Sequence, residues 1–150
     1  MAGDLETKVK AAYLYHLTQF VVWPDLPDDH LHICVRGNDP VGGMLLELSN
    51  RRIRDRTLQI ELDQNIDPAS CHVLFISRSE TGWKSLLGSV RHLNVLTVSD
   101  IDKFADSGGI VGFYSEAGKI KLEINPPAAS ETGLKISSKL MELARHVAPR

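Results

Sequence analysis

The hydrophobic positions of this chain follow two periods, and both are visible in its first third. Through residues 4–22 the apolar side chains recur at three- and four-residue steps, which predicts an amphipathic helix that Pro24 ends; these positions are Val9, Ala12, Tyr13, His16, Leu17 and Phe20. In residues 31–35 apolar side chains alternate with short or polar ones, as in a strand. A turn of Gly, Asn, Asp and Pro at 37–40 leads into an apolar helix at 41–49, so these elements form the first half of a βαβ unit.

The rest of the chain continues this alternation of strands and helices. Residues 58–62 predict an edge strand with one wet face, whereas the apolar runs at 73–76 and 93–98 are typical of strands buried on both faces. The other predicted elements are helices at 80–90 and 101–105, a β-hairpin of 110–114 with 119–125, and a closing helix after Pro126 and Pro127 with the stripe Leu134, Leu140, Met141, Ala144 and Val147.

The second hairpin strand has its own alternation of side chains. We expect its apolar residues to face inward and its charged ones outward, where charges discourage unwanted edge pairing. The inward set is Ile120, Leu122 and Ile124, and the outward set is Lys119, Lys121 and Glu123.

The order of the elements predicts an α/β fold. We expect a three-layer sandwich whose sheet is mostly parallel and doubly wound, with about six strands and an antiparallel edge hairpin. The chain shows no internal repeat, linker or low-complexity segment, so residues 1–150 are interpreted as a single domain.

Composition and charge exclude some classes of function. A net charge of −2 and a pI near 6.3 argue against general nucleic-acid binding, which needs a basic excess. No apolar run approaches the ~20 residues that span a bilayer. The first residues lack the basic and apolar regions of a signal peptide, and a start that replaces a removed signal would look the same.

Two cysteines lie on strands that should be neighbours. Cys34 falls in the first predicted strand and Cys71 begins the third, and such strands are adjacent in a doubly wound sheet. A disulfide is therefore feasible without being required, because both residues could equally be buried thiols.

The motifs of several enzyme and switch classes are missing. A response-regulator receiver needs acidic residues after its first and third strands and a lysine after its fifth, but the corresponding strands end in Arg36 and Gly37, Ser77 and Arg78, and Tyr114 and Ser115. Residues 37–42 have the glycine spacing of a P-loop but continue into Gly43 and Met44, without the lysine and hydroxyl. The helix beginning at residue 41 could still hold a small anion.

Nucleophilic catalysis is not supported either. Cys71 and His72 are neighbours in a predicted strand and point to opposite faces, so His72 cannot readily activate that sulfur. Ser77, Ser79 and Ser99 end strands without a nucleophile elbow. We therefore expect no enzymatic activity, no cofactor and no metal.

Three local features each have a structural and a functional interpretation. The Asp and His residues at 28–32 are better explained as a solvated loop than as a tetrahedral metal site. The arginines in residues 51–56 are better explained as complements of a helix dipole than as a patch for an acidic partner. Trp23 is better explained by core packing than by a partly exposed contact surface.

The chain resembles the YfiR-like family over nearly its whole length, with the matching motifs in the same order. The resemblance is carried by the helix and Trp-Pro signature at 10–24, the strands at 33–37 and 71–77, the block at 96–100 with Phe104, Ala105, Gly108 and Gly109, and the ending at 124–125, 128–129 and 133–140. Each motif alone is weak, and their order makes the resemblance specific.

The resemblance implies a periplasmic, non-enzymatic regulator that lost its signal peptide. Proteins of this family bind the periplasmic part of an inner-membrane diguanylate cyclase and hold it inactive, and their release raises cyclic di-GMP and favours biofilm formation. An outer-membrane lipoprotein can sequester them, and they tend to be homodimers. Cys34 and Cys71 match one family disulfide; a second pair known in the family is missing here.

The functional surface is expected at the carboxyl ends of the strands, where open sheets bind ligands. The candidate contact residues are Gly37, Asn38, Ser77, Arg78, Ser99 and Asp100, with Trp23 as a further candidate. The competing hypotheses are a small-ligand sensor domain, either alone or within a membrane signalling receptor, and a cytosolic flavodoxin-like enzyme.

Overall fold

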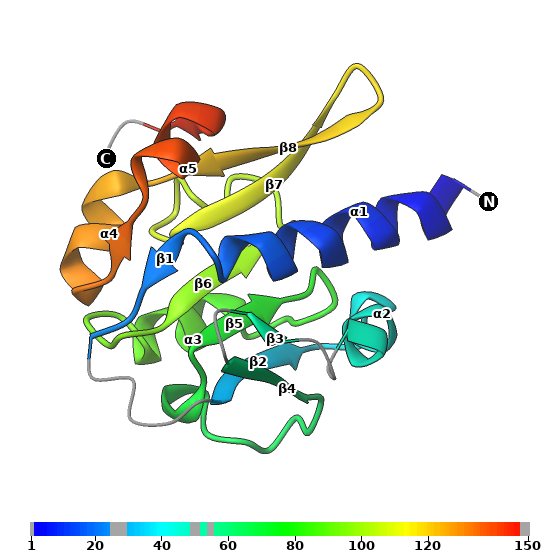
Figure 1. Ribbon diagram of the computed structural model, residues 1–150, viewed down its shortest axis with the longest axis horizontal. Coiled ribbons are helices and arrows are strands. Elements are labelled where there is room, and N and C mark those ends of the chain that lie inside the picture. Colours follow the sequence, from blue (N-terminus) through cyan, green and yellow to red (C-terminus); the bar gives the residue numbers. More distant parts are fainter. Residues whose placement is uncertain (1, 25–29, 49–51, 54–55, 148–150) are drawn as a thin grey trace.

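The structure is a computed structural model that describes residues 2–24, 30–48, 52–53 and 56–147 (Figure 1). Its elements are α1 (Ala2–Leu17), β1 (Val21–Val22), β2 (His30–Arg36), α2 (Val41–Leu48), β3 (Arg52–Ile53), β4 (Arg56–Glu61), the 3-10 helix η1 (Pro68–Ser70), β5 (Val73–Ile76), α3 (Trp83–Ser89), β6 (Leu96–Ser99), β7 (Val111–Glu116), β8 (Lys119–Ile124), α4 (Pro126–Thr132), β9 (Lys135–Ile136), α5 (Ser138–Leu143) and β10 (Arg145–His146).

The main sheet has the strand order β10-β8-β7-β6-β5-β2-β4-β3. Strands β4, β2, β5, β6 and β7 are parallel to their neighbours in that series, and β8 returns antiparallel to β7. The predicted α/β class, with a mostly parallel sheet and an antiparallel hairpin, is therefore confirmed. β3 and β10 add two residues each at the edges, and β1 pairs with β9 in a separate small sheet.

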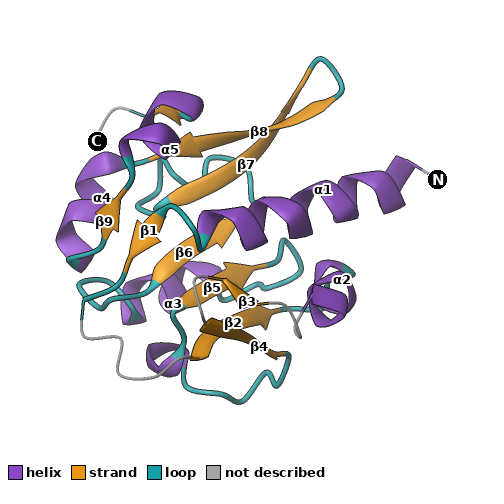
Figure 2. Cartoon of the chain, viewed as in Figure 1, coloured by secondary structure: helices purple, strands orange, loops and turns teal. Residues whose placement is uncertain are grey.

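Helices cover both faces of the sheet, which gives the three layers (Figure 2). Side chains that alternate along β2, β5 and β6 divide into two apolar clusters, because successive strand residues point to opposite faces. One cluster packs under α1 and α2, and its strand members include Ile33, Val35, Val73, Phe75, Leu96 and Val98. The other packs under α3 and includes Cys34, Leu74 and Ile76. β5 and β6 are buried throughout, as their apolar runs predict.

The first helix differs from its prediction in both length and phase. α1 ends at Leu17, and Val21 and Val22 then form a strand that pairs with Lys135 and Ile136. β-branched valines favour this extended pairing over a further helical turn. Within the predicted stripe Leu17 is buried, at 1% exposed, whereas Ala12 and His16 are exposed. The other buried residues of α1 are Lys10, Ala11 and Leu14, so the buried face is rotated by about one residue from the predicted stripe.

Two predicted helices are wrong. Residues 101–108 form a series of turns that place Phe104 in the core. The single closing helix is divided into α4 and α5, because Gly133 adopts a φ of 80° at the end of α4 and β9 follows it. A left-handed residue of this kind commonly ends a helix.

One strand prediction holds in part, and another is wrong. β3 is the outermost strand and pairs with Arg56 and Thr57 of β4, whereas the predicted edge residues 58–61 pair only with β2 among the described strands. On β8, Glu123 is not an outward charge: it is 6% exposed, and its Oε2 accepts a hydrogen bond of 2.6 Å from Nη2 of Arg145. Arg145 belongs to β10, whose pairing with β8 was not predicted from the sequence.

Candidate functional site

The carboxyl ends of β2, β5 and β6 lie next to one another, because these three strands are parallel neighbours. They bring the six predicted strand-end residues together as one edge of the sheet. This edge, called the rim below, consists of Gly37, Asn38, Ser77, Arg78, Ser99 and Asp100. The sequence therefore predicted the grouping, but the roles of its members differ from one another.

Hydrogen bonds from backbone amides to side chains fix the turn after β2 against the loops after β4 and β5. The amide of Asn38 donates to Oγ of Ser79 at 2.9 Å, and the amide of Gly37 donates to Oε1 of Gln64 at 2.6 Å. Gly37 has a φ of 95°, and a Cβ added there would lie 2.8 Å from Cβ of Ser77. Glycine is thus required at position 37 by both conformation and space.

Ser77 and Ser99 hold the rim from inside. Ser77 is 2% exposed and donates from Oγ to Oδ2 of Asp39 at 3.0 Å. Ser99 is fully buried and donates to the carbonyl of Ile76, while its Oγ accepts from the amide of Ile101. The expectation that these two serines are exposed contacts is wrong, because both are buried. Their hydroxyls have internal acceptors, as buried hydroxyls generally do.

Asp100 is the centre of a charge cluster under the rim. It is 7% exposed, and its Oδ2 lies 2.8 Å from Nζ of Lys10 and 3.4 Å from Nε of Arg78. Lys10 comes from α1, is itself 8% exposed, and also lies 3.8 Å from Glu6. Oδ1 of Asp100 is buried without a hydrogen-bond partner within the described part of the chain. Asp100 therefore anchors α1 to the sheet, and it is not an exposed contact.

The exposed part of the rim is small and polar. The side chain of Arg78 is 66% exposed, and Asn38, just past the end of the neighbouring strand β2, is also exposed. Next to Asn38 lies an open depression of about 530 Å³, lined by Val35, Gly37, Asn38, Asp39, Leu62, Gln64 and Ser79. Arg78 and Asn38 are thus the predicted residues that a partner can reach.

Two contributors to this site were missed from the sequence. Lys10 lies four residues before Leu14 and seven before Leu17, on the buried face of α1. A cation at such a position predicts a buried acidic partner. Gln64 lies in an irregular loop, and no periodic signal marks it.

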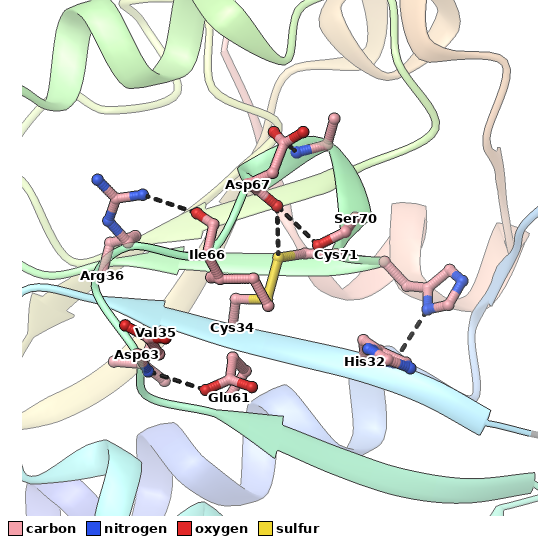
Figure 3. Close-up of a disulfide and its surroundings, with 12 residues drawn as sticks. His32, Cys34, Val35, Arg36, Glu61, Asp63, Ile66, Asp67, Ser70 and Cys71 are labelled. Carbon is pink, nitrogen blue, oxygen red and sulfur yellow. Dashed lines mark hydrogen bonds between the residues drawn. A yellow bond between two sulfur atoms is a disulfide. The ribbon is translucent and has the colours of Figure 1, made fainter.

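The disulfide predicted from the resemblance is present (Figure 3). Cys34 and Cys71 are joined at an S–S distance of 2.00 Å with their Cα atoms 6.0 Å apart, and both residues are buried. Cys71 does not begin the third strand; it follows η1, two residues before β5. The bond therefore attaches η1 to the sheet, and neither sulfur is a free thiol.

Trp23 belongs to the core. It is 5% exposed, and its indole N–H donates to the carbonyl of His72 at 2.9 Å. Of its two interpretations, core packing is confirmed and the exposed contact surface is wrong. The imidazole of His72 accepts a hydrogen bond at Nδ1 from the amide of His32, so it too has a structural role.

The remaining candidate ligand sites have no support. No group of three or more potential metal ligands occurs within the ranges that the structure describes. The stretch at 28–32 and the arginine run at 51–56 lie partly outside those ranges. At the start of α2, Oδ1 of Asp39 accepts from the amide of Val41 at 2.9 Å, so a carboxylate of the chain itself occupies the proposed anion position.

The comparison with protein families decides the relationship. The YfiR/HmsC-like family model matches residues 7–145. The chain belongs to the YfiR/HmsC-like family. The family is one of regulatory proteins, and membership indicates a periplasmic regulator of cyclic di-GMP signalling. None of the described helices is both long and apolar enough to cross a membrane. A search of curated proteins found no match.

Proposed function

We propose that this YfiR/HmsC-like protein binds the periplasmic sensor region of an inner-membrane diguanylate cyclase and holds the cyclase inactive. The observation that carries the proposal is the family match over residues 7–145. The site agrees with a binding role, because the Cys and Ser side chains of the candidate region are bound in a disulfide or in internal hydrogen bonds. Release of the cyclase then raises cyclic di-GMP and favours biofilm formation.

Repression of this kind is a shift between two states of the cyclase. The repressor must bind the inactive state more tightly than the active one, and only that difference in affinity changes the output. An outer-membrane lipoprotein that sequesters the repressor would compete with the cyclase for it. A homodimer of the repressor would present two rims. The periplasmic location agrees with the Cys34–Cys71 disulfide, since such bonds persist in oxidising compartments.

Arg78 is the proposed anchor on the rim. Its Nε lies 3.4 Å from the buried carboxylate of Asp100, which restrains the guanidinium while 66% of the side chain stays exposed. A restrained arginine loses less conformational entropy on binding and often dominates an interface. We therefore expect the cyclase to present an acidic or carbonyl-rich surface to Arg78 and Asn38.

The test is binding of the purified periplasmic region of the cyclase encoded nearest to this chain. Arg78→Ala should weaken binding by about tenfold or more, as for an interface hot spot. Lys139→Ala removes another exposed cation, on α5, and serves as the matched control with unchanged affinity. Absence of any binding by the unaltered chain refutes repression, whereas equal binding by both variants refutes only the rim assignment.

One observation supports a second function, that of a small-ligand sensor. A cavity of about 550 Å³ lies between α3, α4 and residues 106–108. This volume is within the usual range for small-molecule sites. A ligand there could adjust the repressor or act within a larger receptor.

A further inference from the structure

The cavity between α3 and α4 combines an apolar floor with charged walls. Its floor includes Val90, Val95 and Ile110, which are all 2% exposed. Buried Thr97 also lines it: its Oγ1 accepts from the amide of Ile110, and no acceptor for its hydroxyl hydrogen occurs within the described ranges, so the hydroxyl can donate to a ligand. An apolar body with one or two acceptor atoms matches such a lining.

An ion pair joins two walls of the cavity. Arg91, just beyond α3, donates from Nε to Oε2 of Glu131 on α4 at 3.0 Å and from Nη2 to Oε1 at 3.4 Å. Both residues line the cavity, and their side chains are 65% and 38% exposed. An ion pair this exposed is weak and easily exchanged, because water competes for both partners.

The segments on either side of this ion pair are joined a second time. The amide of Asn94 donates from Nδ2 to the carbonyl of Thr132 at 2.5 Å. Exchange of the Arg91–Glu131 pair therefore need not separate α4 from the end of α3. The arginine can change partners while the cavity keeps its shape.

We propose that this cavity binds a small monocarboxylate with an apolar body, whose carboxylate replaces that of Glu131 on Arg91. The Glu131 side chain is then an internal substitute for the ligand, which holds the guanidinium in the orientation that a carboxylate requires. The proposal concerns a site away from the rim and does not depend on the binding of a cyclase.

The other charges of the lining restrict the ligand further. Lys84 lines the cavity, and no carboxylate lies within ion-pair distance of it in the described ranges, so it adds to the attraction for an anion. Asp106 lines the cavity from the loop 106–108 and repels a second negative charge. Arginine binds carboxylates through two parallel hydrogen bonds, so one carboxylate is the best match.

The experiment is an NMR titration of the full chain with 3-phenylpropionate, and with 3-phenylpropanamide as the uncharged control of the same shape. A ligand of this size should bind with a dissociation constant on the order of 1 mM. We expect saturable shifts of the amides of Val90, Val95 and Ile110, and binding of the acid about tenfold tighter than of the amide.

Three variants complete the test. Arg91→Gln should remove the preference for the acid over the amide, whereas Glu131→Gln should strengthen binding of the acid severalfold, because the internal competitor is neutral. Lys139→Gln, outside the cavity, should change neither. No saturable shifts at the cavity, equal binding of acid and amide, or an unchanged preference in Arg91→Gln would each overturn the proposal.

Discussion

The buried Lys10–Asp100 ion pair offers the sharpest test of how α1 is held on the sheet. Its atoms are 2.8 Å apart, and the two side chains are 10% and 5% exposed. Ninety positions separate them in the sequence, so the pair joins the first helix to the end of β6. Replacement of either partner alone leaves a charge in a place that water hardly reaches.

The expected cost of a single replacement follows from that burial. Removing one partner of a buried pair costs about 3–5 kcal/mol, because the other charge remains uncompensated. Here Arg78 stays near Asp100, and Glu6 near Lys10, so we expect the lower value, about 3 kcal/mol, for Lys10→Met and for Asp100→Asn. For a domain of this size that loss lowers the Tm by about 6–12 °C.

The double variant is the decisive measurement. Lys10→Met with Asp100→Asn removes both charges, so we expect it to cost about 4 kcal/mol and not the sum of the two single costs, about 6 kcal/mol; the difference is a coupling energy of about 2 kcal/mol in urea unfolding. Arg78→Ala is the control and should cost less than about 1 kcal/mol, since that side chain is largely exposed. Single variants that cost nothing, or costs that simply add, would refute the interpretation of the pair as a fastening of α1.

Further predictions concern the disulfide, the turn after β2 and the cavity. The double replacement of Cys34 and Cys71 by Ala should reduce the free energy of unfolding by about 4 kcal/mol for a 37-residue separation, measured by denaturant unfolding against the unreduced chain. Gly37→Ala should cost about 1–3 kcal/mol by the same assay, because its φ is 95° and its Cβ would overlap the Ser77 side chain. The hydrogen bond from Arg91 lowers the pKa of Glu131, so the stability it contributes is present above the unfolded-state pKa and is lost as the pH falls through the folded-state pKa. An NMR pH titration should find the pKa of Glu131 below its ordinary value in the unaltered chain and nearer to that value in Arg91→Gln.

The elements that the sequence predicted well are those with one strong signal. Continuous apolar runs identified β5 and β6, and the Gly, Asn, Asp and Pro turn after β2 led to α2 as expected. The wrong helices are those whose ends depend on distant contacts. α1 ends early because Val21 pairs with Ile136, more than a hundred residues away, and no local pattern contains that partner.

For the candidate site, the sequence predicted which residues lie together but not which of them are exposed. The topology rule placed Asn38, Arg78 and Asp100 at one edge, since the ends of neighbouring parallel strands meet there. It could not assign exposure, which depends on what covers each side chain. Asp100 is covered because Lys10 of α1 contacts it. The predicted helix stripe did not include Lys10, so that prediction did not indicate this contact.

The distribution of engaged and exposed groups agrees with a binding role for this rim. Here Ser77 and Ser99 donate to internal acceptors, and Asp100 is paired with Lys10. Arg78 remains exposed, and a guanidinium stays protonated and recognises carboxylates by geometry. The polar side chains of the rim thus hold its own loops in place, while Arg78 is available to bind a partner protein.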